Sequence, residues 1–163
     1  MFINFGDVPK NHNLFLDYLY EFENVAEFYR YNFRDKEKYP DIFRNILKKR
    51  TSLNFNISQI IEEQYSELQN ASEKTKKNIK LLELPKTLAV VTGQQLGILG
   101  GPLYTIYKII TVIKLASQLN ERYSDFNFVP VFWMESDDHD FNEVHKINVL
   151  NNENNIVTIR YKE

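Results

Sequence analysis

The feature that most constrains the fold is an apolar run at residues 87–91, followed by a helical pattern from Pro102 and a second apolar run at 126–134. The first run, TLAVV, is short and partly β-branched, which is typical of a buried strand. Beyond Pro102 the apolar side chains return every three or four residues, which predicts a helix. This order predicts a βαβ unit with a parallel sheet and a right-handed crossover.

The chain before this unit has helical periodicity. An aromatic stripe predicts one amphipathic helix over residues 13–31, packed into a core. A second, short helix is expected from Asp41, as its N-cap, to about residue 49. Either one long helix or two shorter ones fit the pattern from residue 57 to Pro85.

The chain after the unit predicts a pair of strands. The runs KINVL and NIVTIRY flank the turn segment NNENN, as expected of a hairpin. We therefore divide the chain into a helical N-terminal region, 1–85, and the opening of an α/β fold, 86–163.

Composition excludes several classes of function. The 163 residues amount to about one domain, and 43% of them are hydrophobic, enough for a packed core. The absence of cysteine excludes disulfides and thiolate metal sites. A net charge of -2 gives no reason to expect nucleic acid or an anionic membrane as partner. No signal-peptide pattern or bilayer-length apolar run is present, so we expect a cytoplasmic protein.

Four of the five glycines lie within residues 93–101, in the loop TGQQLGILGG that joins the first strand to the helix. Gly100 and Gly101 allow positive φ and close approach of a ligand, and Pro102 is suited to the first helical position. A helix N-terminus is an anion site, and ligands gather at the carboxyl ends of parallel strands. The loop matches neither GxGxxG nor GxxxxGK[ST], so a purely structural turn remains an alternative.

Polar side chains around this loop supply hydrogen-bond donors. They are Thr92, Gln94, Gln95, Thr105 and Lys108. For Lys108, which lies in the predicted helix, a solvated position on the helix surface is the alternative.

A second polar cluster, ESDDHDFNEVH at 135–145, follows directly on the second strand. Five carboxylates repel one another, so a metal, a cationic partner or raised pKa values are expected to compensate. Oxygen ligands suit Mg²⁺ or Mn²⁺, and the imidazoles add zinc or iron to the candidates. A carboxylate beside His139 can orient this residue as a general base. The alternative is a solvated acidic loop.

The two motifs together resemble a known family. TLAVVTGQQLGILGGPLYTIYKIITVIKLA and VPVFWMESDDHDFNEV are similar to the signature segments of the bacillithiol-biosynthesis cysteine-adding enzymes, and FENVAEFYRYN and ENNIVTIRY fit the same family. The residues that match the first motif are Thr92, Gly93, Gln94, Gln95, Gly100, Gly101, Tyr104 and Lys108. Those that match the second are Ser136, Asp138, His139, Asp140 and Phe141. The departures are Leu99, Asp137 and Asn142.

The resemblance implies a Rossmann-like, nucleotidyltransferase-like parallel sheet core and a ligase that adds cysteine to glucosaminyl-malate, the last step of bacillithiol synthesis. Amide formation from a carboxylate needs an activated acyl group, so we expect ATP-dependent activation, and Mg²⁺ is a candidate cofactor to which no residue is assigned. The first set of matching residues would bind the cofactor, and His139, Asp138 and Asp140 would be catalytic. The family also has a C-terminal coiled coil and forms homodimers. Since the similarity covers only the first part of a typical member, we expect a fragment of the full fold with open sheet edges.

Two other functions remain as alternatives. The acidic cluster fits a metal-dependent phosphoesterase or nucleotidyltransferase. The chain also fits a non-catalytic fragment that binds a nucleotide without turnover.

Overall fold

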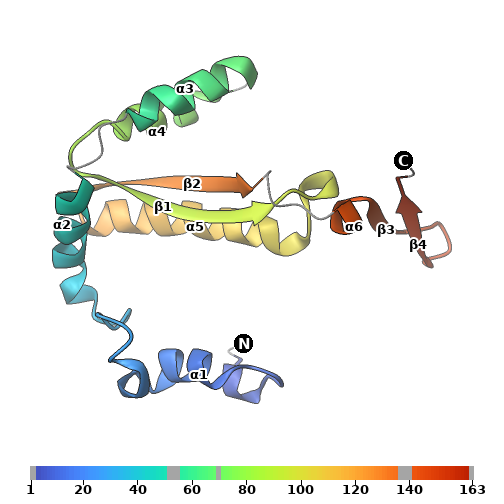
Figure 1. Ribbon diagram of the computed structural model, residues 1–163, viewed down its shortest axis with the longest axis horizontal. Coiled ribbons are helices and arrows are strands. Elements are labelled where there is room, and N and C mark those ends of the chain that lie inside the picture. Colours follow the sequence, from blue (N-terminus) through green and yellow to red (C-terminus); the bar gives the residue numbers. More distant parts are fainter. Residues whose placement is uncertain (1–2, 51–55, 69–70, 136–140, 162–163) are drawn as a thin grey trace. The chain divides into compact units, whose positions relative to one another are not determined.

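The computed structural model describes residues 3–50, 56–68, 71–135 and 141–161 (Figure 1). The chain forms two compact units, Met1–Lys49 and Arg50–Glu163, and each is described by itself. The predicted division between residues 85 and 86 marks a change in sequence pattern inside the second unit, and it stays a prediction.

The first unit differs from the single aromatic helix predicted for residues 13–31. Helix α1 (Asn13–Tyr20) ends at Tyr20, and a 3₁₀ turn, Phe22–Val25, follows. The side chain of Asn24, in this turn, donates a hydrogen bond to the carboxylate of Asp17, in α1, at 3.1 Å, and so holds the turn against the helix. Crowded aromatic residues lose rotamer freedom in a helix, so little opposes this break.

The aromatic stripe of this unit packs only in part. The Tyr18 ring lies 4.8 Å from Tyr29 and 5.1 Å from Phe33, centroid to centroid. Leu14, Phe28 and Tyr29 are exposed, so the prediction that the whole stripe is core is wrong for these three side chains. Helix α2 (Tyr39–Arg50) begins two residues before Asp41, which lies in the first turn and is not the N-cap.

The second unit begins with two helices, which decides between the alternatives left open by the sequence. They are α3 (Ile57–Leu68) and α4 (Glu73–Leu81). Helix α4 starts independently because the Ser72 hydroxyl accepts a hydrogen bond from the Thr75 amide at 3.1 Å, an N-cap.

The predicted βαβ unit is confirmed. Strand β1 (Thr87–Gln95) pairs in parallel with β2 (Asn127–Glu135), and helix α5 (Leu103–Arg122) connects them (Figure 1). The register runs without interruption from Thr87 opposite Asn127 to Gln95 opposite Glu135. Strand β1 is longer than the predicted 87–91 and includes residues 92–95 at its end.

The core of this unit lies at the amino ends of the two strands. Helix α5 contacts both strands and α4 contacts β2, so the two faces of this end are covered. Its buried side chains include Leu88, Val112, Ala116, Phe128 and Val129.

Two polar side chains fasten this end of the sheet. Asn120 of α5 accepts from the Phe128 amide at 2.9 Å and donates to the Phe128 carbonyl at 2.8 Å. Arg50 donates to the carbonyls of Leu82 and of Thr87, the latter at 2.9 Å. Backbone groups that would otherwise lack partners are therefore satisfied.

The C-terminal part confirms the predicted strand pair. After the short helix α6 (Phe141–Val144), β3 (Lys146–Leu150) and β4 (Ile156–Arg160) form an antiparallel hairpin. Asn154 takes a positive φ of 61° in the turn, and its neighbour Asn151 accepts hydrogen bonds from the amides of Glu153 and Asn155. Among the described residues, no helix has the length and apolar character needed to span a membrane.

Candidate functional site

The carboxyl ends of β1 and β2 meet at one edge of the sheet. Gln95 lies opposite Glu135, and the Leu96 amide donates to the Glu135 carbonyl at 3.2 Å. The glycine loop leaves β1 at this point, and Ser136 is bonded directly to Glu135. Both predicted motifs therefore start from the same edge.

Two of the four clustered glycines are explained by contacts within the protein. A Cβ on Gly93 would lie 2.7 Å from the Trp133 carbonyl oxygen of the neighbouring strand. A Cβ on Gly97 would lie 2.5 Å from the Cα of Gly101. These distances are too short for any side chain, so the backbone here approaches other backbone.

The other two glycines have the positive φ that was predicted for them. Gly100 and Gly101 have φ values of +89° and +77°, the region that glycine adopts without strain. A Cβ on Gly100 would meet nothing within 4 Å, so this part of the loop is open. Pro102 is the N-cap of α5 and not its first helical residue, and its ring has no acceptor that could bond to the first amides of the helix.

Thr105 lies directly beneath this loop. Thr105 is only 6% exposed, and its Oγ1 is buried with no hydrogen-bond partner among the described residues. A Cβ on Gly101 would lie 3.3 Å from that oxygen, which is a tight contact, so glycine at this position avoids crowding the hydroxyl. An unsatisfied buried hydroxyl costs free energy, so a water molecule or a ligand is expected to bond to it.

Lys108 is tied to the end of β1 by neutral groups. Its ammonium donates to the Gln94 side-chain oxygen at 2.9 Å and to the Gly93 carbonyl at 3.2 Å. The Gln94 amide nitrogen donates to the Tyr104 hydroxyl at 3.1 Å, and the Lys108 ammonium lies 5.1 Å from the Tyr104 ring centroid. The side chain is exposed, as the alternative of a solvated position on the helix surface expects, and it also bonds to the strand end, so the role of Lys108 in binding stays a prediction.

A groove of about 400 Å³ runs beside this cluster, between β1 and α5. Thr92 and Lys108 supply polar groups, and the remaining lining is mostly apolar or aromatic, including Val90 and Tyr107. Its volume is in the range of small-molecule sites. Gln95, the predicted cofactor-binding residue not yet described, is exposed at the end of β1.

The predicted catalytic residues His139, Asp138 and Asp140 lie outside the described residues, as do Ser136 and Asp137. Of the flanking members, Glu135 ends β2, and His145 follows α6 with its ring stacked on Phe141 at 5.2 Å. Within the described ranges, no group of three acidic or histidine side chains is arranged to hold a metal. The roles of these residues stay predictions.

Trp133 is a neighbour of the site that sequence reasoning did not select. The residue is 62% exposed, and its indole nitrogen donates to the Glu135 carboxylate at 3.0 Å. Side chains alternate along a strand, so Trp133 and Glu135 share one face. This spacing in the sequence could have identified Trp133 as a neighbour of Glu135.

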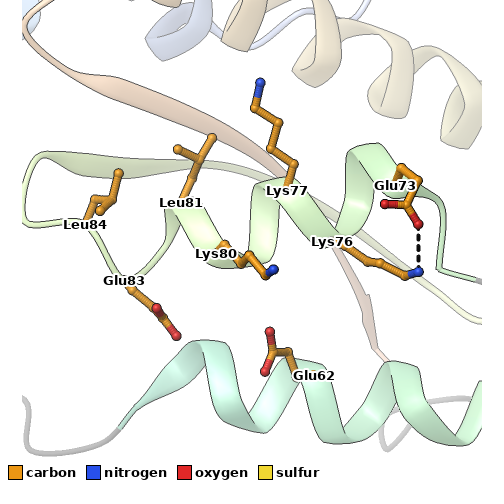
Figure 2. Close-up of a pocket in the computed structure, with 8 residues that line it drawn as sticks. All are labelled: Glu62, Glu73, Lys76, Lys77, Lys80, Leu81, Glu83 and Leu84. Atoms are coloured by element: carbon orange, nitrogen blue, oxygen red, sulfur yellow. Dashed lines mark hydrogen bonds and ion pairs between the residues drawn. The ribbon is translucent and has the colours of Figure 1, made fainter.

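A larger groove, about 750 Å³, lies at helices α3 and α4 (Figure 2). Figure 2 shows Lys76 paired with Glu73, and Lys77 and Lys80 on the same helix, with Glu62 on α3. Lysines and glutamates are mixed there, and none of the lining residues belongs to either motif. The arrangement is that of a solvated surface.

The sequence of the whole chain, residues 1–163, matches the family described as "Bacillithiol biosynthesis BshC, N-terminal Rossmann-like domain". Relatives from Christiangramia forsetii and Flavobacterium psychrophilum are 41% and 38% identical, each over 83% of this chain and 25% of the relative. A relative from Chloroherpeton thalassium is 36% identical over 92% of this chain and 27% of its own length. All three are named "Putative cysteine ligase BshC". The chain thus spans about a quarter of the length of these relatives.

Proposed function

The chain belongs to the bacillithiol-biosynthesis BshC family, and from this premise we propose that it contributes the cofactor-binding edge of a ligase that adds cysteine to glucosaminyl-malate. Family membership confirms the resemblance and the Rossmann-like fold class predicted from the sequence. The substrate, the cofactor and the activity belong to the proposal.

One observation carries it: the two motifs leave the sheet at the same edge. The Leu96 amide bonds to the Glu135 carbonyl at 3.2 Å, so the glycine loop and the segment that holds His139 start side by side. A ligase must bring an activating group and a substrate carboxylate together, and the carboxyl edge of parallel strands is where such groups gather.

The residues at this edge fit ATP. The N-terminus of α5 carries a partial positive charge, Gly100 is open, and the Thr105 hydroxyl lacks a partner in the described structure. Backbone amides of Gly100 and Gly101, with Lys108, would hold phosphate oxygens. Thr92, Gly93, Gln94, Gln95 and Tyr104 complete the proposed set.

Amide formation replaces a carboxylate oxygen of the malyl group by the nitrogen of cysteine. When bound, ATP supplies the group that makes this oxygen a leaving group. In the proposal, His139 accepts the proton that the cysteine nitrogen loses, and Asp138 or Asp140 orients the imidazole. The donors of the glycine loop stabilise negative charge at the phosphates. Mg²⁺ accompanies the nucleotide and has no assigned ligand in the chain.

The test is a ligation assay with glucosaminyl-malate, cysteine and ATP, in which the product is identified by its mass. It compares the 163-residue chain, a protein extended to the length of the relatives, and the His139→Ala variant of the extended protein. We expect product from the extended protein, and a loss of about 100-fold or more in the variant, as is typical for a general base. A homodimer, a coiled coil and a cytoplasmic location are further predictions for the extended protein.

The same assay decides against the proposal if the extended protein gives no ligation product. Phosphoester turnover that needs Mn²⁺ or Zn²⁺ would instead support the metal-dependent alternative. Nucleotide binding without any turnover would support a non-catalytic binding protein.

A further inference from the structure

The hydrogen bonds around Lys108 have only one consistent direction. An ammonium group donates and cannot accept, so the oxygen of the Gln94 amide must face Lys108. The NH₂ group of Gln94 then faces the Tyr104 hydroxyl, and that oxygen must accept. The hydrogen of the Tyr104 hydroxyl is therefore directed away from Gln94 and is available to another acceptor.

Lys108 also keeps capacity for a ligand. Two of its three hydrogens are used, by the Gln94 side chain and the Gly93 carbonyl. Both of these oxygens are neutral, and no carboxylate lies within ion-pair distance of Lys108 in the part of the chain that the structure describes. A positive charge that is held in place by neutral groups attracts an anion.

Tyr104 and Lys108 are placed for joint action. They are separated by four positions on α5, one turn of the helix, and the ammonium lies 5.1 Å from the Tyr104 ring. Both side chains are exposed and line the groove beside β1. Gln94 bonds to both, and it reaches them from the end of the strand.

We propose that Gln94 is a positioning residue, which holds the Lys108 ammonium and the Tyr104 hydroxyl as a pair of donors that receives one oxyanion of the ligand. This inference rests on the proposed function and divides the roles within its site: Lys108 and Tyr104 contact the ligand, and Gln94 acts through them. The oxyanion is a phosphate or a carboxylate, since both accept a hydrogen bond and a charge-assisted one together.

The experiment measures binding of inorganic pyrophosphate and of L-malate to the 163-residue chain by calorimetry. Pyrophosphate represents the phosphates of a nucleotide, and malate represents the carboxylates of the substrate. Binding of either probe supports the inference and identifies the source of the oxyanion. If neither probe binds to the folded chain at millimolar concentration, the inference is overturned.

Three variants assign the roles. Lys108→Gln should weaken binding by about 10- to 100-fold, the size of a charge-assisted hydrogen bond. Tyr104→Phe keeps the ring and should weaken it by about 2- to 10-fold. Gln94→Ala should weaken it by about 10-fold, because both donors lose their orientation. The control Lys114→Gln removes an exposed charge from the same helix and should leave binding unchanged.

The decisive measurement is the double variant Gln94→Ala/Lys108→Gln. If Gln94 acts through its two partners, the double variant should bind more weakly than Lys108→Gln alone by a factor no larger than the loss in Tyr104→Phe. If Gln94 contacts the ligand itself, the two losses multiply and the positioning role is rejected. Thermal unfolding of each variant should match that of the parent chain, and a loss of stability that accounts for the weaker binding would also reject it.

These outcomes are separate from those of the ligation assay. A chain that binds the probe through Lys108 but belongs to a protein without ligase activity keeps the inference and loses the proposed function. If the extended protein ligates and Gln94→Ala leaves its rate unchanged, the proposed function is supported and the inference is rejected.

Discussion

The two ends of the β1–β2 sheet are built for different purposes. At the amino end, Phe128 is 3% exposed and its backbone is bonded to Asn120 of α5. At the carboxyl end, on the same strand, Trp133 stands out in solvent, and polar side chains surround the glycine loop. We infer that packing at the amino end stabilises the sheet. The carboxyl end can therefore carry the open backbone at Gly100 and the unsatisfied hydroxyl of Thr105.

The largest expected difference in stability is between variants of two aromatic residues of β2, Phe128 and Trp133. Phe128→Ala should lower the free energy of unfolding by about 3–5 kcal/mol, the usual cost of removing a buried aromatic side chain. Trp133→Ala should change it by no more than about 1 kcal/mol, because little surface is buried there. Urea unfolding followed by circular dichroism measures both. Equal losses for the two variants would contradict the division of the sheet.

The second effect concerns the polar fastening of the buried end. Asn120→Ala removes the partners of the Phe128 amide and carbonyl, and should cost about 3 kcal/mol, since each unpaired buried group costs about 1–3. Gln118→Ala, an exposed position on the same helix, is the control and should stay within about 0.5 kcal/mol. A small loss for Asn120→Ala would mean that water replaces the side chain, and that this end is less closed than described.

The third effect separates two glycines of the open end. Gly93→Ala should cost about 2 kcal/mol, because the new Cβ would lie 2.7 Å from the Trp133 carbonyl oxygen and the strands must shift. Gly100→Ala should cost about 1 kcal/mol, from its positive φ alone. If Gly100 faces the ligand, its variant should lose binding of the probe anion out of proportion to its stability. The reverse order of the two stability losses would contradict the assignment of Gly93 to packing.

Regular, local patterns were predictable from the sequence. The spacing of apolar residues along α5 and the β-branched residues of β1 identify the βαβ unit, since a helix or strand face is a local property. The break of the aromatic helix after Tyr20 was missed because apolar spacing continues across it. Residues 92–95 join β1 only because β2 extends equally far, and such register is set by the partner strand.

The place of the glycine loop was predictable from the sequence, and the contacts around it were less so. Glycine clustering and the strand order placed the loop at the carboxyl edge, as described. The contacts of Lys108 with Gln94 and Gly93 join positions 14 and 15 residues apart, and no spacing rule reports which oxygen a lysine reaches. The need for glycine at positions 93 and 97 likewise depends on backbone far along the chain or across a turn.

The smallest expected effect tests whether surface charge contributes to the stable end of the second unit. The hydrogen bond from Lys76, and then its charge, lowers the pKa of Glu73 in the first turn of α4 below the ordinary value of 4.5. A carboxyl whose pKa is lower in the folded state stabilises the fold above its unfolded pKa, and loses this contribution as the pH falls through the folded value. Glu73→Gln should therefore be slightly less stable than the parent chain at neutral pH. The difference should shrink as the pH falls below 4.5 and vanish below the folded-state pKa, which is lower. Urea unfolding over a pH series measures this difference, and added salt should reduce it because the pair is exposed. A difference that grows towards acid pH would contradict the charge effect, because the carboxyl is neutral there. A difference that exceeds the loss in Asn120→Ala would show that charges on α4 and not the buried residues around Phe128 hold this end together.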